Sequence, residues 1–283
     1  MAIGVALGGA LGIGSADFLG GLCARRSGSL ATSFWMNLVA LVGLTPTWLV
    51  VQPQLSTGRA LGALAAGVVS AAAVNLIYAA LSTSLMSLVA PAIACGSALV
   101  PTAVAAVVGN APSVGNGIGI ALALVGIVSV TWMPRAAAPR SRLERRALIL
   151  TLLASVFSGL SFSIALLAVR GGTAQTAVGV SALERLGATF AALLLATRLV
   201  RGRRLVVPGG AALLGAGCLD GAGVTLLLVS ATLGNFAVSA VIVSLYAVVT
   251  VLLAQIVLRE RIASHQIFGI GAAVLGVALL STG

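Results

Sequence analysis

The sequence predicts an all-α integral membrane protein with ten transmembrane helices, arranged as two inverted five-helix repeats. Three observations lead to this fold class. Of the 283 residues, 60% are hydrophobic and only 7% are charged. The apolar residues form ten runs, and one basic stretch divides these runs five and five. Since a soluble domain carries roughly a quarter of charged residues, this composition excludes a water-exposed surface over most of the molecule.

Each apolar run is close to the roughly 20 residues that a membrane-spanning helix needs. In hydrocarbon the backbone must satisfy its own hydrogen bonds, which favours helices, whereas a β-barrel would show short alternating segments. The first run contains Asp17 and lacks a basic leader, so we expect a span and not a cleaved signal peptide. The runs cover approximately residues 2–22, 31–51, 60–81, 86–108, 113–133, 147–169, 176–197, 206–229, 236–258 and 264–282.

The longest polar stretch, residues 134–146, contains two prolines and five arginines. We therefore expect an N-terminal five-helix repeat at 1–133, a basic linker at 134–146 and a C-terminal five-helix repeat at 147–283. A pattern G-I-x-x-A-x-x-G-[I/V] occurs in both the fifth and the tenth run, although chance recurrence of small residues is an alternative explanation. Because each half has an odd number of spans, the second half inserts into the membrane in the opposite orientation to the first. Such inverted repeats are typical of secondary transporters.

The net charge of +11 comes from sixteen arginines, without any lysine. These arginines lie between apolar runs, so we expect contact with the lipid bilayer and not with nucleic acid. Loops after odd-numbered runs carry thirteen arginines, whereas loops after even-numbered runs carry only Arg59 and Arg170. Because cytoplasmic loops of membrane proteins are rich in basic residues, the odd loops are expected in the cytoplasm and both termini outside.

Neither a metal nor another cofactor is expected. Cys23, Cys95 and Cys218 lack the spacing of a metal site or a disulfide framework, so we interpret them as small packing residues. An enzyme is not expected either, because the sequence lacks ligand clusters and its lone histidine, His265, is badly placed for a serine–histidine protease. A passive channel or scaffold stays open as an alternative.

Four ionisable residues fall inside the predicted spans: Asp17, Glu184, Arg185 and Asp220. Charge at membrane depth normally faces the interior of a helix bundle or a wet cavity. Asp220 is midway along its run and is the best candidate for coupling, whereas Asp17 and Glu184 could equally be interfacial. Arg185 has two interpretations, a ligand for a substrate carboxylate or a structural ion pair with Asp220, and we favour the ion pair.

A second set of residues combines aromatic faces with sparse polar groups, as small-molecule sites do. Tyr78 and Tyr246 are the only tyrosines, and a buried tyrosine hydroxyl normally needs a hydrogen-bond partner. Packing or interhelical hydrogen bonding is the alternative for each residue. The candidate substrate-binding residues are Tyr78, Tyr246, Phe162, Ser244, Asn75 and Trp35, with Asn37 and Ser158 as further polar members of the set.

Several short motifs resemble the drug/metabolite transporter superfamily, in particular its ten-helix EamA-type branch. In the first half these are Gly14-Ser15-Ala16-Asp17-Phe18, Tyr78-Ala79-Ala80-Leu81, Ala90-Pro91 and Leu99-Val100-Pro101-Thr102. In the second half, residues 244–254 and Leu258-Arg259-Glu260-Arg261-Ile262, followed by Gln266 and Gly269, are more similar still. Ala247 departs from a proline common in the family, and residues 109–117 lack the acidic-basic pair of the second half.

The resemblance implies a secondary transporter of small metabolites that works by alternating access. The nearest branch consists of bacterial exporters of amino acids, including aromatic ones, so amino acids are the expected substrates and the bacterial inner (plasma) membrane the expected location. A drug or cation exporter of the same fold is the alternative, followed by a membrane-embedded enzyme or a passive channel. A monomer is expected.

The arginine asymmetry predicts the topology. With Cys23, Cys95 and Cys218 replaced, a cysteine at Arg140→Cys in the basic linker should react with a membrane-impermeant maleimide only after the membrane is permeabilised, because this loop is expected in the cytoplasm. A cysteine beside either terminus should react in intact cells. Labelling of the linker from outside would reverse the orientation.

Overall fold

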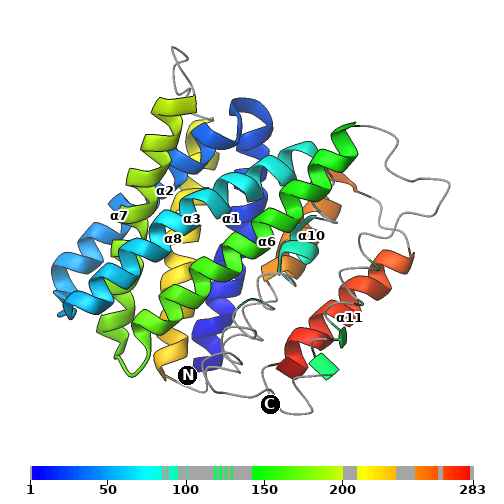
Figure 1. Ribbon diagram of the computed structural model, residues 1–283. Helices are drawn as coiled ribbons and strands as arrows, with labels where there is room; N and C mark the ends of the chain where they lie inside the picture. The colour runs from blue at the N-terminus through cyan, green and yellow to red at the C-terminus, as the bar shows by residue number, and fades with distance from the viewer. Residues whose placement is uncertain are drawn as a thin grey trace.

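The structure, a computed structural model, describes most of the chain as α-helix, and no strand occurs among the residues that it describes (Figure 1). The fourth and fifth expected spans and the first half of the ninth lie largely outside those residues, as does Ser244. The described residues are 2–84, 86, 89–94, 100, 118, 119, 121, 122, 125, 129, 142–199, 209–233, 246–260 and 264–280.

Eight helices are described, and six of them are long and apolar enough to cross a membrane. The predicted all-α membrane character is thereby supported, while the count of ten spans and the inverted repeat stay predictions. The helices are α1 (Ala2–Ser27), α2 (Ser29–Val51), α3 (Thr57–Thr83), α6 (Arg142–Val169), α7 (Ala174–Leu199), α8 (Gly210–Leu233), α10 (Tyr246–Leu258) and α11 (Ser264–Leu280). The six long ones are α1, α2, α3, α6, α7 and α8.

Two helix ends extend beyond the apolar runs that predicted them. α1 continues to Ser27, so that Arg25 and Arg26 form its last turn. α6 begins at Arg142, and residues 142–146 of the expected linker are therefore helical. In both cases the hydropathy of the sequence marks where the apolar segment stops, but the helix itself continues because arginine favours helix and its charge can reach water.

The bundle is built around pairs of helices from the two halves of the chain. α3 packs most extensively against α6, and the two lie side by side in Figure 1. α1 packs most extensively against α8 and also contacts α2, α3 and α10. α7 packs against α3 and α2. These contacts bring the middle parts of α1, α2, α7 and α8 together.

Small residues allow the closest of these helix contacts, as is usual in membrane bundles. Between α1 and α8, a Cβ atom added at Gly12 would lie 2.9 Å from the Leu219 carbonyl oxygen. Between α3 and α7, a Cβ at Gly187 would lie 2.5 Å from the Leu64 carbonyl oxygen, and a Cβ at Gly67 would overlap the carbonyl oxygen of Glu184. The backbones thus touch where a side chain would hold them apart.

One polar contact ties together three helix ends on the side that the arginine bias assigns to the cytoplasm. Arg25 Nη2 donates to the carbonyl oxygens of Leu81, at 3.4 Å, and Ser84, at 3.2 Å, beyond the end of α3. The same atom lies 3.7 Å from Glu260 Oε1, which accepts a hydrogen bond from the Met86 amide at 3.2 Å. The acidic residue of the Leu258–Ile262 motif therefore connects α10 to α1 and α3.

The outer surface of the bundle is apolar, as expected for contact with lipid. Val50 is 85% exposed, Ile256 74% and Phe268 68%. Cys23 is buried, in agreement with its expected packing role, whereas Cys218 is exposed on α8 and the packing interpretation is wrong for this residue.

The contact between α3 and α7 generates a stability prediction. Gly67→Ala should destabilise the protein by roughly 1–3 kcal/mol, the usual range for overpacking a tight contact, because the new methyl group meets the α7 backbone. The melting temperature of the purified protein in detergent measures the effect. Gly62→Ala on the same helix is the control, since its Cβ would lie at an ordinary 3.6 Å from Ala168 Cβ. Equal melting temperatures for the two variants would contradict the packing argument.

Candidate functional site

A buried ion pair between Arg185 and Asp220 forms the centre of the site. Arg185 Nη1 lies 2.7 Å from Asp220 Oδ2, and the two side chains are 3% and 14% exposed. Arg185 is near the middle of α7 and Asp220 near the middle of α8. Of the two interpretations of Arg185, the pair with Asp220 is the one that the structure forms.

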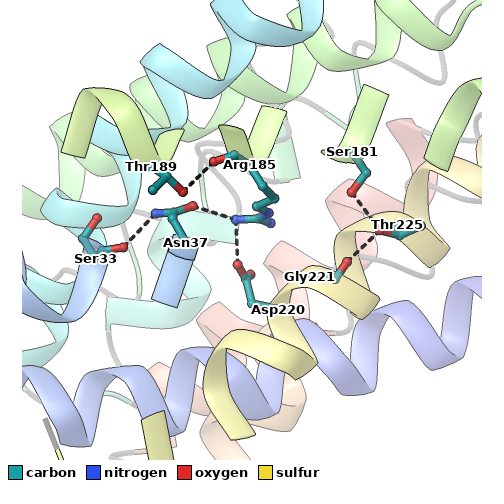
Figure 2. A network of polar contacts seen from close by, with 8 residues as sticks. All are labelled: Ser33, Asn37, Ser181, Arg185, Thr189, Asp220, Gly221 and Thr225. Atoms are coloured by element: carbon teal, nitrogen blue, oxygen red, sulfur yellow. Dashed lines mark hydrogen bonds and ion pairs between the residues drawn. The ribbon is translucent and has the colours of Figure 1, made fainter. Parts of the chain in front are cut away.

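Asn37 on α2 also contacts this guanidinium (Figure 2). Its Oδ1 accepts a hydrogen bond from Arg185 Nη1 at 3.1 Å, and its Nδ2 donates to the Ser33 carbonyl oxygen at 2.8 Å. Both ends of the amide are thus used. α2, α7 and α8 meet through one arginine, which fixes their relative rotation.

One further hydrogen bond joins α7 to α8 about one turn away from the ion pair, and a second, within α8, orients it. Thr225 Oγ1 donates to the Gly221 carbonyl oxygen at 2.7 Å. Because a threonine hydroxyl has a single proton, Ser181 Oγ must donate to Thr225 Oγ1, at 2.7 Å. Figure 2 shows this contact beside the ion pair. It strengthens the α7–α8 contact without adding charge.

Asp17 and Tyr78 extend the site towards α1 and α3. Asp17 is close enough to Asp220 for the two carboxylates to repel one another. Tyr78 is 2% exposed and interacts electrostatically with Asp17, Asp220 and Arg185. Its ring lies against Gly20 of α1, where an added Cβ would be 2.5 Å from Tyr78 Cζ. We call Asp17, Asn37, Tyr78, Arg185 and Asp220 the central cluster.

Glu184 lies on a different face of α7 from Arg185, as expected for adjacent residues of a helix. It is 5% exposed, so the interfacial alternative considered for this residue is wrong. Ser70 of α3 hydrogen-bonds its carboxyl group. Within the described part of the chain, Glu184 Oε2 has no hydrogen-bond partner.

The candidate substrate-binding residues separate into two groups. Tyr78 and Trp35 pack with one apolar cluster, which also contains Phe18, Met36 and Leu81. Phe162 and Tyr246 pack with another cluster, around Leu227 and Leu228. Asn75 Oδ1 and Trp35 Nε1 are buried and find no hydrogen-bond partner among the described residues. The structure therefore places Tyr78 beside the buried charges and Tyr246 with the second group.

Sequence reasoning missed the uncharged partners Ser33, Ser70, Ser181 and Thr225. Serine and threonine are common in membrane helices, where they bond their own backbone, and most hydroxyls here do so. No periodicity or spacing in the sequence separates those from the few that bond across helices. To identify these residues from the sequence, one would have to know how each helix is rotated about its axis.

The central cluster contains both signs of charge with spare hydrogen-bonding capacity. Asp220 is ion-paired with Arg185, and Asp17 lies close enough to Asp220 for the two carboxyl groups to interact. Arg185 Nε is buried and has no hydrogen-bond partner in the described part of the chain. Such a cluster can bind a small charged solute. The described residues contain no group of three or more side chains that could hold a metal ion.

Two comparisons with known proteins found similarities. Residues 145–282 match the EamA-like transporter family. A protein of known crystal structure shares the fold of the whole chain, with a TM-score of 0.65 over 98% of this chain and 95% of that protein, at 13% identity. A search of the curated proteins found no match.

The EamA-like match supports the expected drug/metabolite transporter superfamily and a multi-pass membrane transporter of small solutes. The matched residues contain α6, α7, α8, α10 and most of α11, and therefore contain Glu184, Arg185 and Asp220. An EamA-like transporter is consistent with the expectation that the chain is not an enzyme. The fold similarity to the crystal structure extends over 98% of the chain and therefore includes α1 and α2.

The charge balance of the central cluster generates a prediction. Arg185→Gln should destabilise the protein by roughly 3–5 kcal/mol, because it leaves the carboxylate of Asp220 inside the bundle without its cation. Asp220→Asn should cost less, since Arg185 still has Asp17 close to its former partner. Melting temperatures and yields in detergent measure both effects.

The double variant Arg185→Gln, Asp220→Asn is the control for this prediction. It removes the guanidinium together with one carboxylate, so it should be more stable than Arg185→Gln alone. Equal destabilisation by the two single variants would mean that Asp17 does not share the charge of Arg185.

Proposed function

We propose that the chain is a secondary transporter of ten spans in two inverted five-helix repeats, which exports amino acids, aromatic ones included, by alternating access. The observation that carries the proposal is the central cluster of mixed charge halfway along the spanning helices. Carriers of this architecture place substrate near the bilayer midplane, where the repeats meet. Intramembrane charge without a structural need is expensive and is usually retained for a ligand or an ion.

The helix contacts support the inverted repeat. If α1, α2 and α3 correspond to α6, α7 and α8, the contact of α1 with α8 corresponds to that of α6 with α3. The contact of α2 with α8 likewise corresponds to that of α7 with α3, and both corresponding pairs are among the extensive contacts of the bundle. Exchanging the two sets of helices thus leaves the main contacts unchanged, as a twofold relation between halves requires.

The charges of the central cluster are complementary to a zwitterion. The ammonium group of an amino acid would interact with Asp17, whose carboxylate is not part of the ion pair. Its carboxylate would bind the guanidinium of Arg185 through Nε, which has no hydrogen-bond partner among the described residues. Tyr78 and Trp35 offer aromatic faces in the same apolar cluster, which suits an aromatic side chain. Tyr246, Phe162, Ser244 and Asn75 are proposed as further lining residues.

A drug or cation exporter of the same fold is the second candidate. It is favoured by the second carboxyl group of the central cluster, since Asp17 lies close to Asp220 but is not part of the ion pair with Arg185. A cation would bind at Asp17 without using Arg185. The two candidates therefore differ in whether the substrate needs a carboxylate.

The remaining assignments follow from the resemblance and the arginine bias. We place the protein as a monomer in the bacterial inner membrane, with both termini outside and outward transport as the physiological direction. The cytoplasmic contact of Arg25 with Glu260 would then lie on the side from which substrate enters.

Counterflow in liposomes tests the proposal. Purified protein reconstituted with internal phenylalanine should exchange it for external labelled phenylalanine. Phenethylamine, which lacks the carboxylate, and N-acetylphenylalanine, which lacks the charged amine, should compete at least roughly tenfold more weakly, because a hydrogen bond to a charged group contributes about 1.5–3 kcal/mol. Apparent inhibition constants measure the discrimination.

Protein-free liposomes and the variant Arg59→Gln are the controls. Arg59 lies at the start of α3, where it donates to the Arg170 carbonyl oxygen outside the central cluster, so this variant should exchange normally. Equal competition by phenethylamine would favour the cation exporter. Absence of exchange with every amino acid and amine in the panel would reject the transporter assignment to these substrates.

A further inference from the structure

Three exposed arginines lie within the first five positions of α6. Arg142, Arg145 and Arg146 are three and four positions apart, so they share one face of the helix. Glu144 is the only acidic residue among them, which leaves a net charge of +2 from three arginines and one glutamate. Neither of the two ion pairs among the described residues includes any of the three arginines. We call Arg142, Arg145 and Arg146 the α6 basic face.

The α6 basic face continues into an apolar stripe on the same side of the helix. Ile149, Leu152 and Val156 follow it at helical spacing, and all three are exposed. Ala147 and Thr151 lie on the opposite side of α6 and are buried in the bundle. The exposed side of α6 is therefore basic at its beginning and apolar along the following turns.

The α6 basic face lies at the level where the spanning helices end. α6 runs antiparallel to α3 (Figure 1), since Ser161 donates to the Ala66 carbonyl oxygen at 3.0 Å and Gly62 lies against Ala168. The beginning of α6 is therefore beside the end of α3, which Arg25 of α1 contacts. This is the side of the bundle that the arginine bias assigns to the cytoplasm. At this level the hydrocarbon of a bilayer gives way to the lipid headgroups.

The charge of this surface favours an anionic partner. The macrodipole of a helix places partial positive charge at its N-terminus, so cations there are unfavourable and anions are favourable. Arginine guanidinium groups form paired hydrogen bonds with phosphate oxygens. Basic clusters at the cytoplasmic ends of membrane helices attract anionic lipids. A molecule with an anionic phosphate group and apolar chains would match both parts of the exposed side of α6.

We propose that the exposed side of α6 binds an anionic phospholipid. Its phosphate group is held by the α6 basic face, and its acyl chains lie along Ile149, Leu152 and Val156. The lipid thereby stabilises the beginning of α6, and with it the contact of α6 with α3, the most extensive in the bundle. This interaction surface lies outside the central cluster and does not depend on which solute is transported.

The melting temperature of the purified full-length protein in a neutral detergent tests this inference. Phosphatidylglycerol should raise it more than the same amount of phosphatidylcholine, because a ligand that binds only the folded protein stabilises that protein. The double variant Arg145→Gln, Arg146→Gln should need roughly thirtyfold more phosphatidylglycerol for half of the maximal rise, from the combined contribution of two arginines near an anionic surface. Without phosphatidylglycerol this variant should melt at or above the wild-type temperature, because it removes two cations from the beginning of a helix.

The double variant Arg59→Gln, Arg170→Gln is the matched control, since it removes two arginines at the opposite ends of α3 and α6 and should keep the full response. Equal loss of response in the two double variants would overturn the inference, as would an equal effect of the two lipids on the wild type. Soluble glycerol 3-phosphate has the phosphate group without acyl chains and should have little effect. An equal rise with this compound would show an anion site and would reject a phospholipid as its occupant. None of these results would affect the proposed function, because the assay does not involve transport.

Discussion

The neutralisation of Arg185 inside an apolar bundle is the constraint on which the rest of the structure depends. A lone charge at the bilayer centre costs at least about 2.5–3.5 kcal/mol, and an arginine does not lose its proton to escape this cost. Its 2.7 Å contact with Asp220 and its 3.1 Å hydrogen bond to Asn37 therefore require α7, α8 and α2 to meet in one register. Gly221 makes this possible, since a Cβ there would lie 3.0 Å from Ala40 Cβ of α2.

The helices could be predicted from the sequence because hydrocarbon leaves the backbone few alternatives. Apolar runs at 31–51 and 60–81 predicted α2 and α3 to within a few residues. The predicted helix ends were less accurate at Arg25–Ser27 and Arg142–Arg146, where polar residues continue a helix past the apolar segment. The length of an apolar run reflects the thickness of the hydrocarbon layer that the helix crosses. The helix itself can extend beyond that layer.

The charged part of the site was also accessible from the sequence, since a midspan Asp220 and Arg185 stand out against apolar neighbours and need each other. Which of the candidate uncharged groups lie beside this ion pair could not be predicted from the sequence. Asn37 contributes because its position on α2 faces α7, and Tyr78 fits beside Asp17 because Gly20 leaves room for its ring. Both facts depend on how helices are rotated and how closely they approach. The sequence alone gives neither the rotation of each helix nor the distance between helices when the contacting helices are far apart in the chain.

Glu184 and Arg185 are adjacent on α7 but face different helices. Neighbouring residues on a helix differ by about 100° in direction, so one helix presents a balanced charge to α8 and an unbalanced carboxyl group to α3. A tilt or rotation of α7 relative to α3 would also move the guanidinium relative to Asp220 and Asn37. Substrate bound to Arg185 and Asp17 would compensate for the loss of those contacts. Because the guanidinium moves with α7, substrate binding and movement of this helix would be linked directly.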